Sequence, residues 1–250
     1  MNAPPNPHPS PPPNPPQPFP TSLAPQKPST ALMGDDLAYA LPMGIFLVLT
    51  WVGGTWPATY PATYVGKTIA TAVALFLLRG HFTRIVWRYW WLGILVGIVG
   101  IVQWVGMETL ILQYWPHYPR MSHEPYDPFA HFHSAAGAWS FIAVRIAGAT
   151  LLVPVMEELF WRDFLWRTII APNDFKLAHI GEWDPAAFFV VALIFGAGVH
   201  IEWMTAIGWG LMIGLLLLVT RSLGACIIAH AVTNGLLGVY VLYTHQWQWW

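Results

Sequence analysis

Residues 141–170 read FIAVRIAGATLLVPVMEELFWRDFLWRTII, an apolar run that holds the adjacent carboxylates of Glu157 and Glu158 and the arginines Arg162 and Arg167. About 20 apolar residues are enough to cross the hydrocarbon core of a bilayer as a helix. A charged side chain at the bilayer centre costs about 2.5–3.5 kcal/mol on insertion scales, so it persists there only where it is paired or used. The segment therefore predicts a buried membrane helix that carries a functional site.

The composition of the whole chain indicates a membrane protein. Of its 250 residues, 56% are hydrophobic and 9% are charged, whereas soluble domains average about 25% charged residues. Lipid rather than water is therefore expected to cover most of the surface. A net charge of −1 without a basic stripe excludes nucleic acid as a partner. The single cysteine, Cys226, excludes an internal disulfide and a cysteine-based metal site, and we expect it to be a small buried residue.

Two regions follow from the distribution of proline and apolar residues. Residues 1–33 are dense in proline, which removes helix donors and favours an extended chain, so they predict a disordered tail. We interpret this tail as a solvated leader that is dispensable for chemistry, with partner docking as the alternative. Residues 34–250 form the second predicted domain, which spans the membrane.

Apolar segments within this domain predict an all-α fold, a polytopic transmembrane bundle of seven to eight helices. Tryptophan and tyrosine gather at the segment ends, as in the interfacial belts of membrane proteins. The fourth and fifth segments form either one long helix or a broken one. The predicted segments are 38–53, 62–79, 89–112, 136–156, 157–170, 186–201, 203–220 and 223–243.

The arginines and lysines in the short connections predict the orientation of the bundle. They concentrate on one side, which the positive-inside rule assigns to the cytoplasm. The opposing loop, 113–134, has one arginine and four histidines (His117, His123, His131 and His133), which we interpret as a wet loop, with metal binding as the alternative. The residues that set this orientation are Arg79, Arg84, Arg88, Arg162, Arg167, Lys176 and Arg221.

The first motif has the form E-E-x-x-x-R. Glu158 and Arg162 are four residues apart, so on a helix they share a face and form an ion pair. Glu157 is rotated by about 100° from Glu158 and stays free of that arginine. We therefore predict one structural carboxylate, Glu158, and one chemical carboxylate, Glu157. The alternative is a charge cluster that only fixes helix packing.

Two further polar clusters lie on later apolar segments. His230 and Asn234 are four residues apart, so their side chains project together and can donate to an oxyanion or hold a water; an interhelical polar contact is the alternative. His200 ends the 186–201 segment, and alone it could be a satisfied core residue. We expect Glu157, Glu158 and these three residues to line one cavity that opens to the cytoplasm.

The order of these motifs resembles the CPBP family, which includes type II CAAX prenyl endopeptidases and bacteriocin-processing "Abi" proteins. That family shows E-E-x-x-x-R, F-x-x-x-H and H-x-x-x-N or D on consecutive helices. The resemblance covers roughly residues 135–245. The matching residues are Glu157, Glu158 and Arg162 in the first motif, His200 in the second, and His230 and Asn234 in the third.

The second motif departs from the family pattern. Phe195 lies five residues before His200, and Gly196 occupies the usual phenylalanine place. Five residues along a helix turn a side chain by about 140° rather than the 40° of four residues. The role of the family's phenylalanine is therefore not expected of Phe195.

The surrounding sequence is similar to one branch of the family. Glu-Glu-Leu-Phe-Trp-Arg, His-Ile-Glu-Trp and His-Ala-Val-Thr-Asn-Gly-Leu-Leu-Gly resemble the CAAX protease-related proteins that accompany bacterial exosortase systems. This branch implies a multi-pass protein of the bacterial inner membrane, a role in sorting or maturing envelope proteins, and exosortase-system proteins as partners.

The resemblance implies an intramembrane glutamate-type endopeptidase that cleaves a peptide or protein substrate without metal or cofactor. Glu157 and His200 would activate a water, and His230 with Asn234 would stabilise the oxyanion. Three alternatives remain open. They are a zinc hydrolase with Glu157, His200 and His230 as ligands, a non-enzymatic scaffold or immunity protein, and a transporter.

Overall fold

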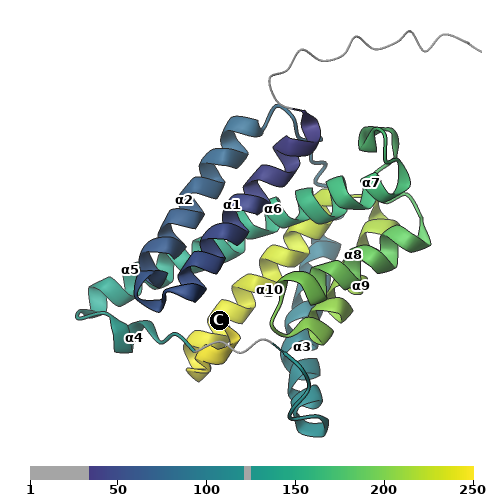
Figure 1. Cartoon of the computed structure of the whole chain (residues 1–250). Coiled ribbons are helices and arrows are strands. Elements are labelled where there is room, and N and C mark those ends of the chain that lie inside the picture. The colour runs from purple at the N-terminus through teal and green to yellow at the C-terminus, as the bar shows by residue number, and fades with distance from the viewer. Residues whose placement is uncertain (1–33, 121–124) are drawn as a thin grey trace, which may run out of the picture. The chain divides into compact units, whose positions relative to one another are not determined.

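The computed structural model describes residues 34–120 and 125–250, so the expected Pro-rich tail lies outside the described residues. The described part of the chain contains helices and no strand, which confirms the all-α prediction (Figure 1). Short 3₁₀ turns at Pro57–Thr59, Phe175–Leu177 and Trp247–Trp249 accompany the helices. The helices are α1 Asp35–Thr55, α2 Tyr60–Leu78, α3 Trp90–Tyr114, α4 Pro128–His131, α5 Ala135–Ala147, α6 Val153–Glu158, α7 Trp166–Ile170, α8 Pro185–Val199, α9 Trp203–Thr220 and α10 Leu223–Thr244.

Six helical runs among the described residues are long and apolar enough to cross a membrane, and a seventh, α8, is apolar but shorter. The chain is therefore an integral, multi-pass membrane protein, as the hydropathy predicts. The fourth and fifth predicted segments form one continuous run, Ala135–Ile170. α8 ends at Val199, so His200 lies outside the helix that was expected to contain it.

The long run Ala135–Ile170 contains two π-helical stretches, Gly148–Leu152 and Leu159–Leu165, on either side of α6. The first precedes Pro154, which has no N–H to donate to the preceding turn. π-helical turns are rare in helices and are frequently found at functional sites. Here they flank the turn that carries Glu157 and Glu158.

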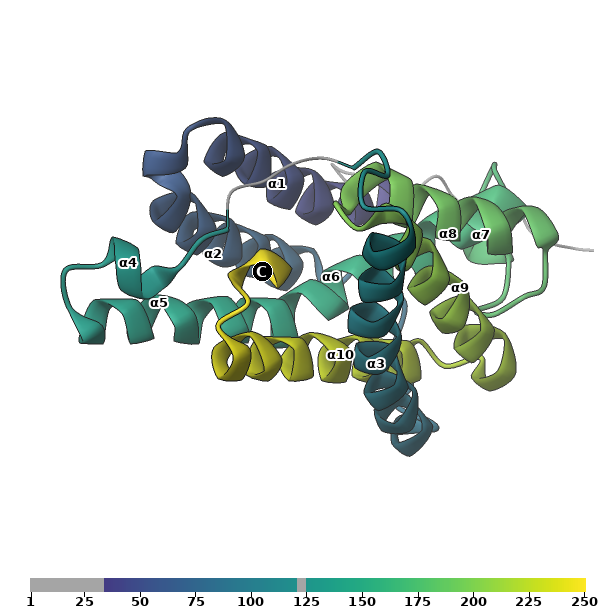
Figure 2. The same ribbon diagram turned by 90° about the horizontal axis from the view of Figure 1, so that it is seen from below.

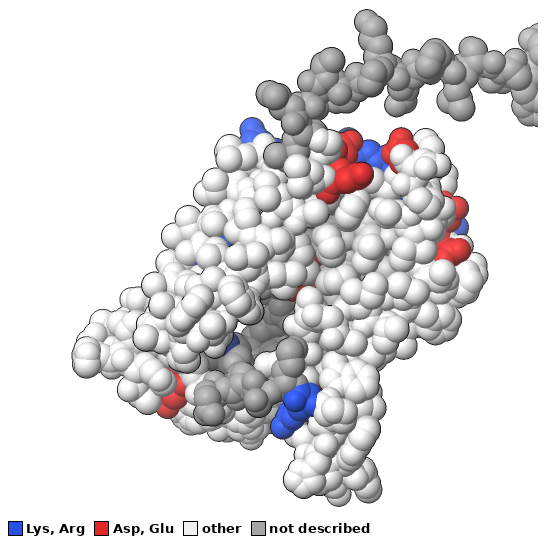
Figure 3. Space-filling model, viewed as in Figure 1, with Lys and Arg blue, Asp and Glu red and all other residues white. Residues whose placement is uncertain are grey.

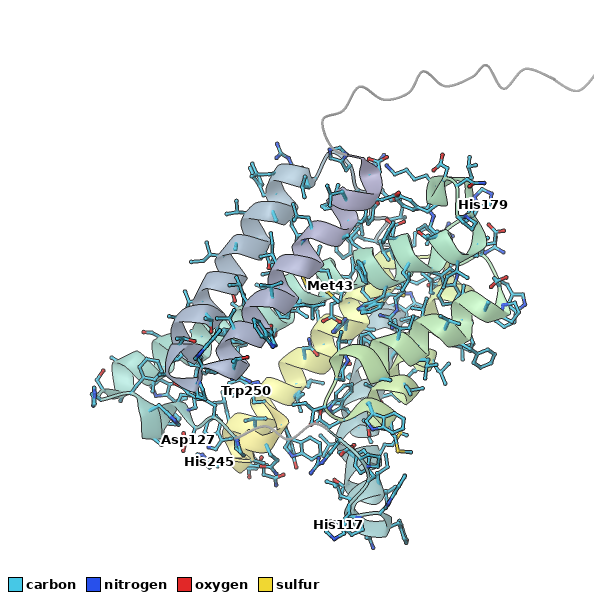
Figure 4. The ribbon with its side chains drawn as sticks, in the orientation of Figure 1. Met43, His117, Asp127, His179, His245 and Trp250 are labelled. Atoms are coloured by element: carbon cyan, nitrogen blue, oxygen red, sulfur yellow. The ribbon has the colours of Figure 1, made fainter. Side chains whose placement is uncertain are left out.

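Successive long helices run in opposite directions between two ends of the bundle (Figures 1 and 2). One end, here the charged end, contains the connections 79–89 and 171–184. The other, here the loop end, contains the connections 115–134 and 200–202 and the segment 245–250. Figure 4 places His179 at the charged end, and His117, Asp127 and His245 at the loop end.

Glycines on α3 bring its backbone against α10. A Cβ atom built on Gly97 would lie 2.7 Å from the carbonyl oxygen of Ala229, and one on Gly93 would lie 2.5 Å from that of Ala225. Real Cβ atoms do not approach other atoms so closely, so the packing requires glycine at both positions. This contact fixes the register of α10, the helix that carries His230 and Asn234.

A buried polar cluster ties the charged end together. The Asp163 carboxylate accepts a hydrogen bond from the Tyr39 hydroxyl at 2.8 Å and one from the Thr83 hydroxyl at 3.2 Å, and pairs with Arg167. These residues come from α1, the 79–89 connection and the long run Ala135–Ile170. Because every polar group of the cluster has a partner, it stabilises the fold and offers nothing to a ligand.

A second buried carboxylate, Glu108 on α3, holds the loop end. It is fully buried and accepts hydrogen bonds from the Tyr118 hydroxyl and, at 2.8 Å, from the Thr205 hydroxyl, and it pairs with Arg120 at 3.3 Å. Burial, together with the contact to Glu108, raises the pKa of the Tyr118 hydroxyl, which therefore stays a donor. The segment after α3 is thus fixed against the start of α9.

Candidate functional site

A cavity of about 230 Å³ lies between α2, α3, α5, α6, α8, α9 and α10. The space-filling view shows a hollow below the middle of the molecule, away from the end where most charged side chains gather (Figure 3). Aromatic rings form much of its wall, including Tyr64, Trp104, Phe195 and Trp209. The polar side chains that line it are Arg145, Glu157, His200, Glu202, His230, Thr233 and Asn234.

Glu158 is the structural centre of the site. Its side chain is fully buried, and one carboxylate oxygen, Oε1, lies 3.3 Å from Arg162 Nη1 and 2.9 Å from His230 Nδ1. The expected pair of Glu158 with Arg162 is therefore present. The contact with His230, which no spacing predicted, joins the long run Ala135–Ile170 to α10.

Glu157 is placed differently from its neighbour. Its side chain is buried but lines the cavity, and its Oε2 atom has no hydrogen-bond partner among the described residues. Since α6 is helical at this point, the two carboxylates point in directions about 100° apart. Glu157 is thus the carboxylate that faces the space where a water or a substrate fits.

His200 lies directly after α8, with an extended backbone at φ −114° and ψ 141°. Its Nδ1 atom is 2.8 Å from the carbonyl oxygen of Phe195. A carbonyl only accepts, so Nδ1 carries the hydrogen, and in the neutral ring Nε2 has the free lone pair. The contact with Phe195 therefore fixes His200 in the tautomer that can accept a proton from the cavity.

Phe195 does pack in the site, contrary to the expectation from its spacing. Its ring centroid lies 4.4 Å from that of His200 and 5.2 Å from that of Trp209, and the guanidinium of Arg162 sits 4.8 Å from its centroid. A separation of 140° applies only if the helix continues through residue 200. α8 ends one residue earlier, and the extended His200 turns back over the phenylalanine.

His230 and Asn234 face the cavity from α10, as their spacing predicts. His230 Nδ1 contacts Glu158, which leaves Nε2 for the cavity. Asn234 donates from Nδ2 to the carbonyl oxygen of Ala149 at 2.9 Å. That carbonyl needs a side-chain donor because Val153 N–H bonds to Gly148 and the next residue, Pro154, has no N–H. The second N–H of Asn234 Nδ2 remains for a ligand.

The cavity lies toward the loop end, whereas the positive-inside rule assigns the charged end to the cytoplasm. Its lining includes Glu202 from the 200–202 connection and Trp249 and Trp250 from the C-terminal turn, and no residue from the charged-end connections. The described loop-end connections carry one arginine, Arg120. The cavity and the arginine-bearing connections thus lie at opposite ends of the bundle. The charged-end connections contain Arg79, Arg84, Arg88 and Lys176, and Arg221 lies in the turn between α9 and α10.

The histidine, cysteine, aspartate and glutamate side chains of the described residues are the possible metal ligands. Within residues 34–120 and 125–250, no group of three or more histidine, cysteine, aspartate and glutamate side chains is close enough to hold a metal ion. His131, one of the loop histidines, stacks on Tyr126 with ring centroids 4.3 Å apart and contacts the Asp127 carbonyl. Cys226 is buried and free, as expected. The zinc alternative finds no ligand cluster in this part of the chain.

Sequence reasoning missed one residue of the cavity lining and one buried ion pair. Arg145 interrupts an apolar stretch and lines the cavity, although only the arginines after Glu157 were considered as site residues. Asp163 and Arg167 form an i, i+4 pair of the same kind as Glu158 and Arg162. The available signal was an arginine inside an apolar segment, since a charge at membrane depth is normally used.

Comparison with known proteins supports a family for the segment that contains the site. Residues 138–236 match the Rce1-like family, described as type II CAAX prenyl endopeptidase Rce1-like. The match spans the motif residues from Glu157 to Asn234 and confirms the resemblance to CPBP-type endopeptidases; it does not extend to the exosortase branch. Neither the curated proteins nor the solved structures contain a significant match to the chain.

Proposed function

From the membership of residues 138–236 in the Rce1-like family, we propose that the protein is an intramembrane glutamate-type endopeptidase. The match itself indicates a membrane endopeptidase; the glutamate mechanism is our proposal. The single observation that supports it most is the difference between the adjacent glutamates: Glu158 pairs with Arg162 and His230 through Oε1, whereas Glu157 forms no ion pair with the described residues and lines the cavity.

In the proposed reaction, Glu157 accepts a proton from a water held in the cavity, and the water oxygen attacks the scissile carbonyl carbon. The carbonyl electrons move to its oxygen and form a tetrahedral oxyanion. When the C–N bond breaks, the protonated Glu157 returns its proton to the leaving nitrogen, which departs as an amine. His200 Nε2 accepts a hydrogen bond from the same water and orients it toward the carbonyl.

Stabilisation of the oxyanion falls to α10 in this proposal. Asn234 Nδ2 has one N–H left after its bond to Ala149. His230 Nε2 faces the cavity, and it donates when the ring is protonated on both nitrogens. Donors held in place before the reaction stabilise developing charge without reorganising, and losing one such donor typically costs about 10²–10³ in kcat.

We propose that the substrate reaches the cavity from the non-cytoplasmic side of the bacterial inner membrane. The positive-inside rule places the charged end in the cytoplasm, and the cavity lining reaches the loop end. An envelope polypeptide, held in or beside the membrane, fits this geometry. Work with exosortase-system proteins on such a substrate is the role that the sequence branch suggests.

A non-enzymatic scaffold is less well supported. A scaffold needs the Glu158–Arg162 pair for packing, but it has no use for a second buried carboxylate, Glu157, that lines the cavity and forms no ion pair with the described residues. Leaving such a group unsatisfied costs free energy. The cost is understandable where the group reacts with a substrate.

The proposal is tested by cleavage of peptides in proteoliposomes. A library of peptides from bacterial envelope precursors is incubated with the wild type, with Glu157→Ala and with the control Glu182→Gln, and the products are identified by mass spectrometry. We expect the wild type and the control to cut the same bonds and Glu157→Ala to cut none. Equal cleavage by Glu157→Ala, or no cleavage by any of the three, would overturn the proposal.

A further inference from the structure

Arg145 is a second polar feature of the cavity, and the proposed reaction does not use it. The side chain comes from the last turn of α5, is only 6% exposed and lines the same cavity as Glu157. One of its nitrogens, Nη1, donates to the Tyr60 hydroxyl. The guanidinium carbon lies 5.2 Å from the ring centroid of Tyr64 and 4.6 Å from that of Trp250.

The charge of Arg145 has no acidic counterpart in the part of the chain that the structure describes. No carboxylate oxygen there lies within 4.0 Å of its guanidinium, whereas Arg162, Arg167 and Arg120 each have one. An arginine carries five N–H donors, and the described contacts of this one occupy a single nitrogen. The remaining donors are therefore available to a ligand in the cavity.

Lys67 provides a useful comparison because it is also a buried cation on a membrane helix. Its ammonium donates to the Thr50 hydroxyl at 2.9 Å and lies over the rings of Phe46 and Tyr64. It is not part of the cavity lining. Lys67 thus has its contacts outside the cavity, whereas Arg145 contacts aromatic rings and also lines the cavity.

We propose that Arg145 binds a carboxylate of the peptide substrate, either the free C-terminus or an acidic side chain, and so selects substrates beside the reacting bond. A planar guanidinium matches a carboxylate with two parallel hydrogen bonds. The aromatic rings of Tyr60, Tyr64 and Trp250 hold its plane and exclude water, which strengthens that contact. This inference rests on the proposed function for the identity of the ligand.

The test measures binding and not cleavage, so it can fail or succeed independently of the proposed reaction. Three acetylated hexapeptides share one apolar sequence. The first has a free C-terminal carboxylate, the second a C-terminal amide, and the third an internal glutamate with a C-terminal amide. Dissociation constants are measured in detergent for the Glu157→Gln protein, alone and combined with Arg145→Gln, Arg145→Lys or the control Arg88→Gln, which removes an exposed charge at the charged end, outside the cavity lining.

With Arg145 intact, we expect at least one carboxylate peptide to bind tenfold or more tightly than the neutral peptide. Arg145→Gln should remove that preference and change the affinity for the neutral peptide less than twofold. Arg145→Lys should retain part of the preference, and Arg88→Gln all of it. Whether the first or the third peptide carries the preference identifies the carboxylate as terminal or internal.

Three outcomes would overturn the inference. Equal binding of all peptides to the protein with Arg145 intact removes the anion site. A preference that survives Arg145→Gln assigns it to another residue. If Arg145→Gln and Arg145→Lys both weaken the binding of all three peptides equally, Arg145 is a packing residue of the aromatic wall. Because cleavage is not read out, failure of peptide hydrolysis in the earlier test leaves this result interpretable.

Discussion

Glu158 Oε1 lies 2.9 Å from His230 Nδ1, and this buried contact joins residues that are 72 positions apart in the chain. The same oxygen pairs with Arg162 at 3.3 Å. One carboxylate therefore orients an imidazole on α10 and neutralises a buried guanidinium on its own helix. The neighbouring Glu157 is left free to face the cavity.

Replacing Glu158 should therefore cost stability. Glu158→Ala leaves Arg162, which is 1% exposed, without its only described acidic partner. Breaking a buried ion pair by removing one member typically destabilises by about 3–5 kcal/mol. Thermal unfolding in detergent should show a clearly lower Tm for Glu158→Ala than for Glu157→Ala. Equal Tm values for the two variants would contradict the structural role of Glu158.

The tautomer of His200 leads to a second prediction. In His200→Asn, the amide nitrogen can replace Nδ1 as donor to the Phe195 carbonyl, but nothing replaces the lone pair of Nε2. We expect a folded protein with kcat reduced by about 10²–10⁴, the usual contribution of a positioned acid–base group, and with KM changed little. Unchanged kcat would show that the ring only packs against Phe195 and Trp104.

The contact between α3 and α10 can be tested with two glycines of one helix. In Gly97→Ala the new methyl group would meet the Ala229 carbonyl at 2.7 Å, which forces α3 away from the helix that carries His230. Gly106→Ala is the matched control, because nothing lies within 4 Å of its Cβ position. Thermal unfolding should show a much lower Tm for Gly97→Ala than for the wild type, and an unchanged Tm for Gly106→Ala. Equal behaviour would mean that the helices are not packed as described.

The orientation of the bundle predicts which end a membrane-impermeant reagent reaches. In a Cys226→Ala background, single cysteines replace His245 at the loop end and His179 at the charged end, both exposed. Spheroplasts treated with an impermeant maleimide should label the cysteine at 245, and label that at 179 only after lysis. The reverse pattern would place the cavity in the cytoplasm and overturn the proposed access route.

Most of the fold could be predicted from the sequence because membrane helices leave a strong hydropathy signal. The predicted segments from 38–53 to 223–243 all correspond to helices, with their ends shifted by a few residues. The pair of Glu158 and Arg162 followed from i, i+4 spacing alone. The predicted convergence on one cavity holds for Glu157, His200, His230 and Asn234, whereas Glu158 is buried beside the lining and is not part of it.

The features that sequence could not provide depend on where helices end and how they pack. Phe195 contacts His200 because α8 stops at Val199, and a spacing argument cannot find that end inside an apolar run. The cavity reaches the loop end because of packing between distant helices, which loop charges do not report. Asn234 donates a hydrogen bond to the Ala149 carbonyl, 85 positions earlier in the chain. That carbonyl is available because the helix is irregular just before Pro154.

In the proposed reaction, the Glu157 carboxylate takes the proton of the attacking water. The most direct test of this step uses a peptide that the wild type cleaves and compares kcat and Kd for the wild type and Glu157→Gln, which keeps the size of the side chain but removes the base. For Glu157→Gln we expect a Kd within about twofold of the wild-type value and a kcat lower than that of the wild type by at least about 10³. A Glu157→Gln protein that keeps its fold and retains kcat within tenfold of the wild type would contradict it.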